Sequence, residues 1–151
     1  MIDLQRKAPK ILVIGDLMID HYLWGSCDRI SPEAPVQIVN VECESTVLGG
    51  AGNVINNLNA LGAQVSVISV VGGCEISDEL RGLLTKIDVN VEHLIVQKDR
   101  ITSKKSRIIA AQQQVVRYDR ESTNEISTKS QTIILNTFKK IITNYDAVLL
   151  S

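Results

Sequence analysis

The sequence predicts an α/β fold in which helices flank a mostly parallel sheet and a small antiparallel β lid is attached. Two apolar runs without alternation, 11–14 and 65–71, are typical of strands buried on both faces. Segments with helical spacing of apolar residues separate such runs. Segments 36–41 and 104–118 break this order because they favour half-exposed strands. We therefore expect a right-handed doubly wound sheet with the lid over the carboxyl ends of its strands.

Two acids follow the first apolar run. Asp16 and Asp20 come after Ile11–Ile14, at the predicted carboxyl end of that strand. Ligands of open α/β sheets bind at this edge, and carboxylates there can accept hydrogen bonds from sugar hydroxyls. The alternative is that Asp16 caps a turn and that Asp20 is a solvated surface charge.

A glycine-rich turn leading into a helix is predicted over 48–62. Val54, Leu58 and Leu61 follow helical spacing, and Gly62 stands where a helix ends in a residue of positive φ.

The glycines of this turn suit a ligand that approaches the backbone. Gly49, Gly50 and Gly52 have no Cβ, and the backbone N–H groups of the following helical turn point outward. Asn53 can both donate and accept hydrogen bonds. The site would suit a polyhydroxylated or anionic small molecule. The alternative is a tight turn before a helix that packs closely on a sheet.

The remaining elements follow from periodicity and capping. We expect a helix over 77–86 with Ser77 as its N-cap, a short strand over 89–96, an amphipathic helix over 127–144 and an apolar strand over 145–151. Lys104, Lys105 and Arg107 form a basic cluster in a strand-like segment; it could contact a phosphate or be a solvated strand face.

Composition narrows the class of protein. The 151 residues predict one domain; a formal net charge of -1 and 3% aromatic residues give no sign of nucleic acid binding or of an anionic-membrane patch. Cys27, Cys43 and Cys74 form no Cys-x-x-Cys pair, which favours reduced thiols in the cytoplasm. The segment 1–7 has no apolar core of a signal peptide, and no apolar run reaches membrane-spanning length.

Four motifs, in this order and spacing, carry a resemblance that covers nearly the whole chain. They are Gly15-Asp16-Leu17-Met18-Ile19-Asp20, the segment 29–36 (RISPEAPV), Gly49-Gly50-Ala51-Gly52-Asn53, and the segment 102–107 (TSKKSR) followed by 113–119 (QQVVRYD). The chain resembles the N-terminal portion of a ribokinase-type (pfkB family) carbohydrate kinase. Within that family it is most similar to the kinase domain that phosphorylates D-glycero-D-manno-heptose 7-phosphate.

The resemblance implies a ribokinase-like, Rossmann-like fold and a set of substrate-binding residues. It assigns sugar hydroxyls to Asp20, Gly49, Gly50 and Asn53, with Asp16 close enough to share that role. It assigns Lys105 and Arg107 to the phosphate that the substrate already carries. It also implies that segments of about 29–41 and 102–118 form the lid, through which many members form homodimers.

The phosphoryl donor has no counterpart in the sequence. In the family ATP and Mg²⁺ are held by a C-terminal half whose Gly-Ala-Gly-Asp-like motif supplies the general-base Asp, and no such motif occurs here. We therefore expect residues 1–151 to be the N-terminal part of one truncated kinase domain, with no catalytic or metal-binding residue and no activity alone. The parent reaction would belong to ADP-heptose and lipopolysaccharide core biosynthesis, and some relatives continue into an adenylyltransferase domain.

Three alternatives stay open at this point. A dinucleotide-binding domain would need Gly-x-Gly-x-x-Gly after the first strand, where only Gly15 occurs. A non-catalytic α/β module could use the half-exposed strands to bind a partner. A kinase of another sugar or a nucleoside would keep the chemistry and change the acceptor.

Overall fold

The computed structural model describes residues 8–151 and contains a parallel sheet, which we call sheet A. Its strands are β1 (Lys10–Ile14), β4 (Gln64–Val71), β5 (Leu94–Val96) and β8 (Ala147–Leu150), in the order β5-β4-β1-β8. Every pair in this sheet is parallel. The predicted doubly wound arrangement is thereby confirmed.

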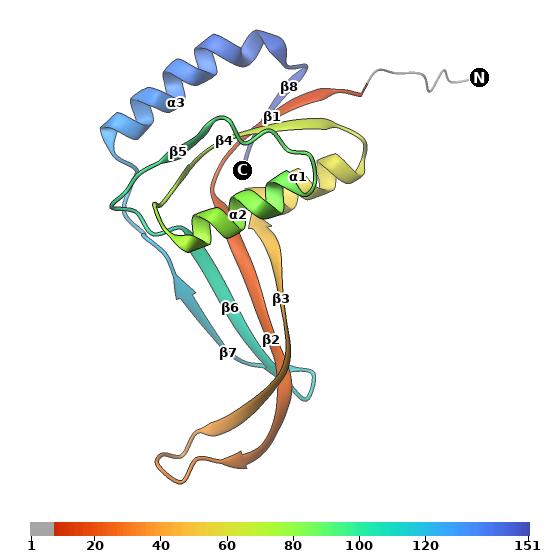
Figure 1. Ribbon diagram of the computed structural model, residues 1–151, viewed down its shortest axis with the longest axis vertical. Helices are drawn as coiled ribbons and strands as arrows, with labels where there is room; N and C mark the ends of the chain where they lie inside the picture. The colour runs from red at the N-terminus through yellow and green to blue at the C-terminus, as the bar shows by residue number, and fades with distance from the viewer. Residues whose placement is uncertain (1–7) are drawn as a thin grey trace, which may run out of the picture.

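Helices cover both faces of sheet A. On one face α1 (Ala51–Ala60) and α2 (Glu75–Thr85) pack together, and on the other lie α3 (Thr128–Ile141) and the 3₁₀ turn η1 (Ile142–Asn144) (Figure 1). Neighbouring residues of β1 point to opposite faces, so that Val13 enters the cluster under α1 and α2 while Leu12 packs under α3. Burial on both faces explains why these strands read as continuous apolar runs.

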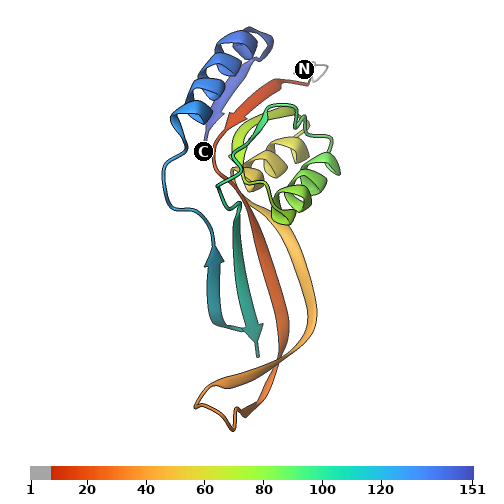
Figure 2. The same cartoon turned by 60° about the vertical axis from the view of Figure 1, so that its left-hand side comes forward.

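The lid is a second sheet made of four long strands. These are β2 (Leu17–Ile30), β3 (Gln37–Gly50), β6 (Ser103–Ala110) and β7 (Gln113–Arg120), in the order β3-β2-β6-β7. The β2–β6 pair is parallel and the two outer pairs are antiparallel. Figure 2 shows this sheet extending away from sheet A as a long twisted ribbon.

The lid reaches further back along the chain than the sequence predicted. The expected segment 29–41 covers only the far hairpin, because β2 begins at Leu17, directly after β1. We expected Asp20 at the carboxyl end of the first strand. Instead, it lies within the lid strand β2. Residues 17–30 were not predicted as a strand because no clear alternation runs through them, and because β6, with which they pair in parallel, is distant in the chain.

Two details of the predicted helices are wrong. Leu61 is 84% exposed, because α1 ends at Ala60 and Leu61 is already its C-cap. Ser77 is not an N-cap, because α2 begins at Glu75 with Cys74 in that position. The expected positive φ of Gly62 is confirmed at 87°.

Among residues 8–151, none of the helices has the length and apolar character needed to cross a bilayer. The segment 1–7, from which the sequence argument about a signal peptide came, lies outside the described residues.

Candidate functional site

Asp20 and Arg107, both predicted as site residues, lie side by side on one face of the lid. In the β2–β6 register Asp20 is opposite Lys105 and Tyr22 is opposite Arg107, so the four side chains share a face. The Arg107 guanidinium lies over the Tyr22 ring, 5.3 Å from its centroid, and donates to Asp20 Oδ1 at 2.5 Å. Two residues that are far apart in the chain thus form a half-buried ion pair.

Gly49 makes room for the Asp20 carboxylate. A Cβ built on Gly49 would lie 2.5 Å from Asp20 Oδ2 and 2.9 Å from its Cγ, closer than any real side chain approaches. Gly49 is itself buried. The absence of a Cβ at Gly49 therefore leaves space for the Asp20 side chain. The sequence analysis expected this space to be used by a ligand.

Gly50 is required by the backbone. Its φ of 56° is in the left-handed region, and a Cβ there would lie 2.6 Å from the Asp16 carbonyl oxygen. The same carbonyl accepts a hydrogen bond from the Ala51 N–H at 3.0 Å, which joins the start of β2 to the start of α1. Asn53 is exposed in the first turn of α1.

Lys105 is held by two carboxylates. Its Nζ lies 3.1 Å from Asp119 Oδ2 and 3.2 Å from Glu121 Oε2, and Arg117 also contacts Asp119. We call the set of paired charges on this side of the lid the charged face; it consists of Asp20, Lys105, Arg107, Arg117, Asp119 and Glu121.

The pairing shifts the ionisation of these groups. The hydrogen bond to Asp119 raises the pKa of Lys105 above its ordinary value, and the same bond lowers the pKa of the Asp119 carboxyl. The hydrogen bond to Asp20 raises the pKa of Arg107. All three groups therefore remain charged at neutral pH.

A cavity of about 720 Å³ lies where the lid meets sheet A, within the size range of small-molecule sites. Of the predicted site residues only Asp16 lines it. Glu121 connects the cavity to the charged face, since it both lines the cavity and binds Lys105. Sequence reasoning missed the other lining residues. Most of them belong to the polar segments next to β6 and β7 and include Arg100, Thr102, Ser103, Ser122 and Asn124, whereas Leu17 and Met18 lie in β2 and Val70 in β4.

The donor complex that the resemblance implies does not fit the described residues. Within 8–151, no three His, Cys, Asp or Glu side chains are grouped so that they could hold a metal ion. The side chains of the charged face already bind one another. Within residues 8–151, these side chains therefore do not form a site for the Mg²⁺ that accompanies ATP.

Comparison with curated proteins finds close relatives. The chain is 63% identical over 148 residues to "Bifunctional protein HldE" of Sulfurimonas denitrificans, covering 98% of this chain and 31% of the relative. It is 50% identical over 151 residues to the protein of the same name from Helicobacter hepaticus, again covering 31% of that relative. The chain thus spans about a third of the length of these curated relatives.

Comparison with solved structures supports the fold at low identity. A carbohydrate kinase from Agrobacterium tumefaciens matches with a TM-score of 0.70 and 20% identity, covering 94% of this chain and 45% of that one. The microbiome-derived acarbose kinase Mak1 matches with a TM-score of 0.66 and 17% identity, covering 95% and 46%.

A family model shows the class of protein to which the chain belongs. The model described as "pfkB family carbohydrate kinase" matches residues 8–151, which is the whole of the described chain. The resemblance drawn from the four motifs is confirmed. The chain belongs to the pfkB family of carbohydrate kinases.

Proposed function

We propose that this chain is the acceptor-binding and lid portion of an ATP-dependent kinase that phosphorylates the anomeric hydroxyl of D-glycero-D-manno-heptose 7-phosphate. The observation that supports this most is the pairing of Asp20 with Arg107 on a lid face beside a cavity of about 720 Å³. The high identity to proteins named HldE favours the same acceptor.

The sugar would bind through Asp16, Asp20 and the glycine turn. Asp20 Oδ1 accepts from Arg107, which leaves Oδ2 as an acceptor for a hydroxyl group. Asp16 lines the cavity, and Gly49, Gly50 and Asn53 lie at or next to the start of α1. A carboxylate oriented by an arginine can accept from a hydroxyl without reorganising when the sugar arrives.

The phosphate of the acceptor would bind to Lys105 and Arg107. The Lys105 ammonium has three N–H donors and makes two hydrogen bonds, to Asp119 and Glu121. Arg107 donates to Asp20 from one guanidinium nitrogen. Both side chains therefore keep donors for a phosphate. Because Asp119 and Glu121 neutralise Lys105, a phosphate would bind by sharing these donors and not through an unpaired positive patch. This favours a sugar phosphate, which also anchors its hydroxyls, over free phosphate.

Partners and location complete the proposal. A homodimer through the lid is supported by its exposed apolar side chains, which include Trp24, Ile30, Val36, Val41, Val47, Val115, Val116 and Tyr118. Three free cysteines favour the cytoplasm. ATP and Mg²⁺ would be bound by a longer protein of which this chain is the acceptor part, and its general-base Asp would lie beyond residue 151.

Calorimetric titration tests the acceptor. We expect D-glycero-D-manno-heptose 7-phosphate to bind the 151-residue chain, and the unphosphorylated heptose and inorganic phosphate to bind at least tenfold more weakly, a difference of about 1.4 kcal/mol. Tighter binding of another sugar or of a nucleoside would identify that compound as the acceptor. No binding of any of these compounds would favour a partner-binding module.

A turnover assay tests whether the donor site lies outside residues 1–151. ATP, Mg²⁺ and the heptose phosphate should give no ADP above background with this chain, because phosphoryl transfer depends on positioning both reactants. Robust turnover would contradict the proposal that the donor site lies outside residues 1–151.

A further inference from the structure

Two hydroxyls are buried where the lid meets α2, away from the charged face. Ser77, in the first turn of α2, and Thr102, the residue before β6, are each only 3% exposed. Both contact Gly72, which follows the last residue of β4. Hydroxyls this deeply buried need hydrogen-bond partners, and these are supplied by one another and by the backbone N–H and C=O groups of one residue, Gly72, while Cys74 Sγ lies 3.6 Å from Ser77 Oγ.

The hydrogen bonds form a closed ring whose directions can be assigned. Gly72 N–H donates to Thr102 Oγ1 at 2.7 Å, and Ser77 Oγ donates to the Gly72 carbonyl at 2.6 Å. The two hydroxyl oxygens are 2.7 Å apart. Because the single hydroxyl proton of Ser77 is used on Gly72, Thr102 must be the donor between them. Removing either hydroxyl leaves buried polar groups without partners.

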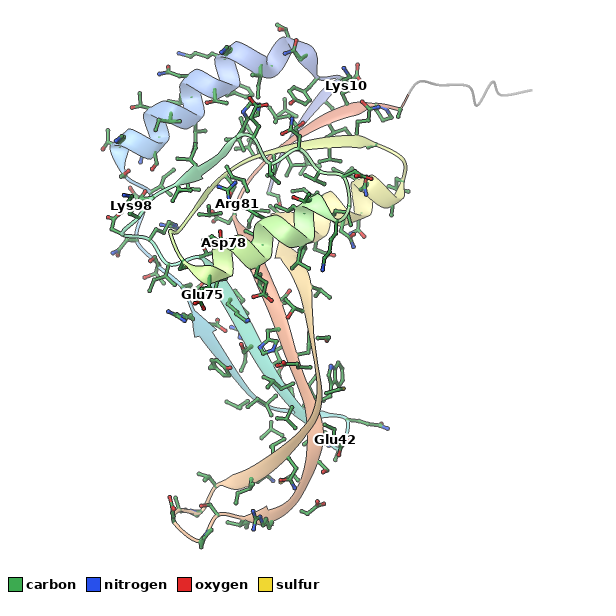
Figure 3. The ribbon with its side chains drawn as sticks, viewed as in Figure 1. Lys10, Glu42, Glu75, Asp78, Arg81 and Lys98 are labelled. Atoms are coloured by element: carbon green, nitrogen blue, oxygen red, sulfur yellow. The ribbon has the colours of Figure 1, made fainter. Side chains whose placement is uncertain are left out.

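The ring fastens three segments at one point. A Cβ on Gly72 would lie 2.1 Å from the Arg100 carbonyl oxygen, so the end of β4 and the segment leading to β6 are in direct backbone contact. The N-terminal end of α2, marked by Glu75 in Figure 3, lies over the base of the lid. A second tie follows close by, where Lys104 Nζ lies 3.3 Å from Glu79 Oε2 of α2.

The ring lies beside the cavity wall and at the start of the strand that carries part of the charged face. Residues 100–103 all line the cavity, and the next residues along β6 carry the charged face. A shift of Thr102 would therefore move the cavity wall and Lys105 together.

We propose that Ser77 and Thr102 are positioning residues for the acceptor, because the ring that they form holds β6 in place relative to sheet A. Ser77 would act through the ring alone, whereas Thr102 also forms part of the cavity wall. The identity of the acceptor rests on the function proposed above. The ring itself rests on the contacts of Gly72.

The test compares Thr102→Val, which keeps the shape and loses the hydroxyl, with Thr102→Ser, which keeps the hydroxyl. Ser77→Ala serves as the second variant, should Thr102→Val fail to fold. Calorimetry with D-glycero-D-manno-heptose 7-phosphate is run at a temperature where circular dichroism shows every variant folded. Amide exchange is followed over 100–105, with 65–68 of β4 as the internal reference.

We expect Thr102→Val and Ser77→Ala to bind the heptose phosphate about tenfold more weakly, by about 1.4 kcal/mol. Exchange should rise over 100–105 and stay unchanged over 65–68, and Thr102→Ser should match the unmodified chain. A merely stabilising ring would lower the melting temperature and leave affinity unchanged in the folded variants, which would overturn the proposal.

If the unmodified chain binds no heptose phosphate, the proposed function fails and the exchange comparison still decides the ring. Unchanged exchange over 100–105 in both Thr102→Val and Ser77→Ala would then overturn it.

Discussion

Sheet A and the lid are sheets of four strands each, but different forces hold them. Leu12, Val13 and Ile68 of sheet A are fully buried, with helices on both faces. In contrast, every residue of β7 is exposed, and the lid carries its ion pairs on an open face. Sheet A is stabilised mainly by apolar burial, which depends little on pH and is not screened by salt as ion pairs are. In the lid, Leu17 and Ile19 at the start of β2 enter the core, and the rest of the sheet relies on its backbone ladder and on paired charges, whose strength depends on pH and on salt.

The difference matches the division of roles that we propose. A rigid, apolar sheet can hold the ends of the strands in place, while a polar sheet can exchange its internal partners for a ligand's hydroxyl and phosphate groups. Four experiments compare the two regions, in order of decreasing expected effect.

The largest contrast should come from deleting the same side chain in each sheet. Ile68→Ala in β4 removes a fully buried side chain and should lower the free energy of unfolding by about 2–5 kcal/mol. Ile30→Ala at the far end of β2, where the side chain is 66% exposed in the single chain, should change the free energy of unfolding of the monomer by less than about 0.5 kcal/mol. Urea denaturation at low protein concentration measures both. At concentrations where the proposed homodimer forms, the loss in Ile30→Ala should grow, because a second copy of the chain would then cover this side chain.

The next effect concerns the acid of the lid. Gly49→Ala should displace the Asp20 carboxylate, because the new methyl group would overlap Asp20 Oδ2. We expect at least tenfold weaker binding of the heptose phosphate, about 1.4 kcal/mol, by calorimetry. Gly82→Ala in α2, where a Cβ meets nothing within 4 Å, is the matched control and should bind normally. Equal affinity of the two variants would remove Asp20 from the proposed site.

The third effect is a difference between the two sheets in how their stability depends on pH. The pKa of Asp119 is lowered by Lys105, so this contact contributes stability above the ordinary carboxyl pKa and loses it as the pH falls through the lowered value. The pKa of Lys105 is raised, so its contribution is lost only in alkali. Protection factors of β6 and β7 should therefore fall in acid before those of β4. In Asp119→Asn this acid-dependent difference should shrink, and an unchanged difference would show that other groups cause it.

The smallest effect concerns the tie between α2 and the lid. Lys104 and Glu79 are partly exposed, so Glu79→Gln should lower the free energy of unfolding by less than about 1 kcal/mol, and less at high salt. Urea denaturation at two salt concentrations measures this. A larger, salt-independent loss would mean that Glu79 stabilises the lid by packing and not by charge.

Prediction from sequence worked best where local pattern and burial agree. The runs 11–14 and 65–71 became β1 and β4 with nearly the expected bounds, since strands buried on both faces must be apolar throughout. Ser127 was not singled out as a cap, although it accepts a hydrogen bond from Ser130 N–H at the start of α3. The strand β2 was missed, because apolar and polar residues do not alternate clearly along it and because one of its two partners, β6, lies far along the chain.

The candidate site was foreseen as a set of residues and not as an arrangement. Asp20, Gly49 and Arg107 were each singled out, but their mutual contact was not. No local signal in the sequence pairs Lys105 with Asp119 and Glu121, because charge along a sequence does not reveal which groups neutralise each other in space.

By itself, the sequence determined the family, the layered α/β class and the residue types available for a sugar phosphate, because periodicity and short motifs are local properties. Only the tertiary structure decided that the lid's cations are already paired, that Gly49 is needed by Asp20, and that Ser77 and Thr102 close a ring on Gly72. These contacts depend on strand register and helix placement, which bring together residues such as Asp20 and Arg107, 87 positions apart. Register is set by the packing of the whole molecule.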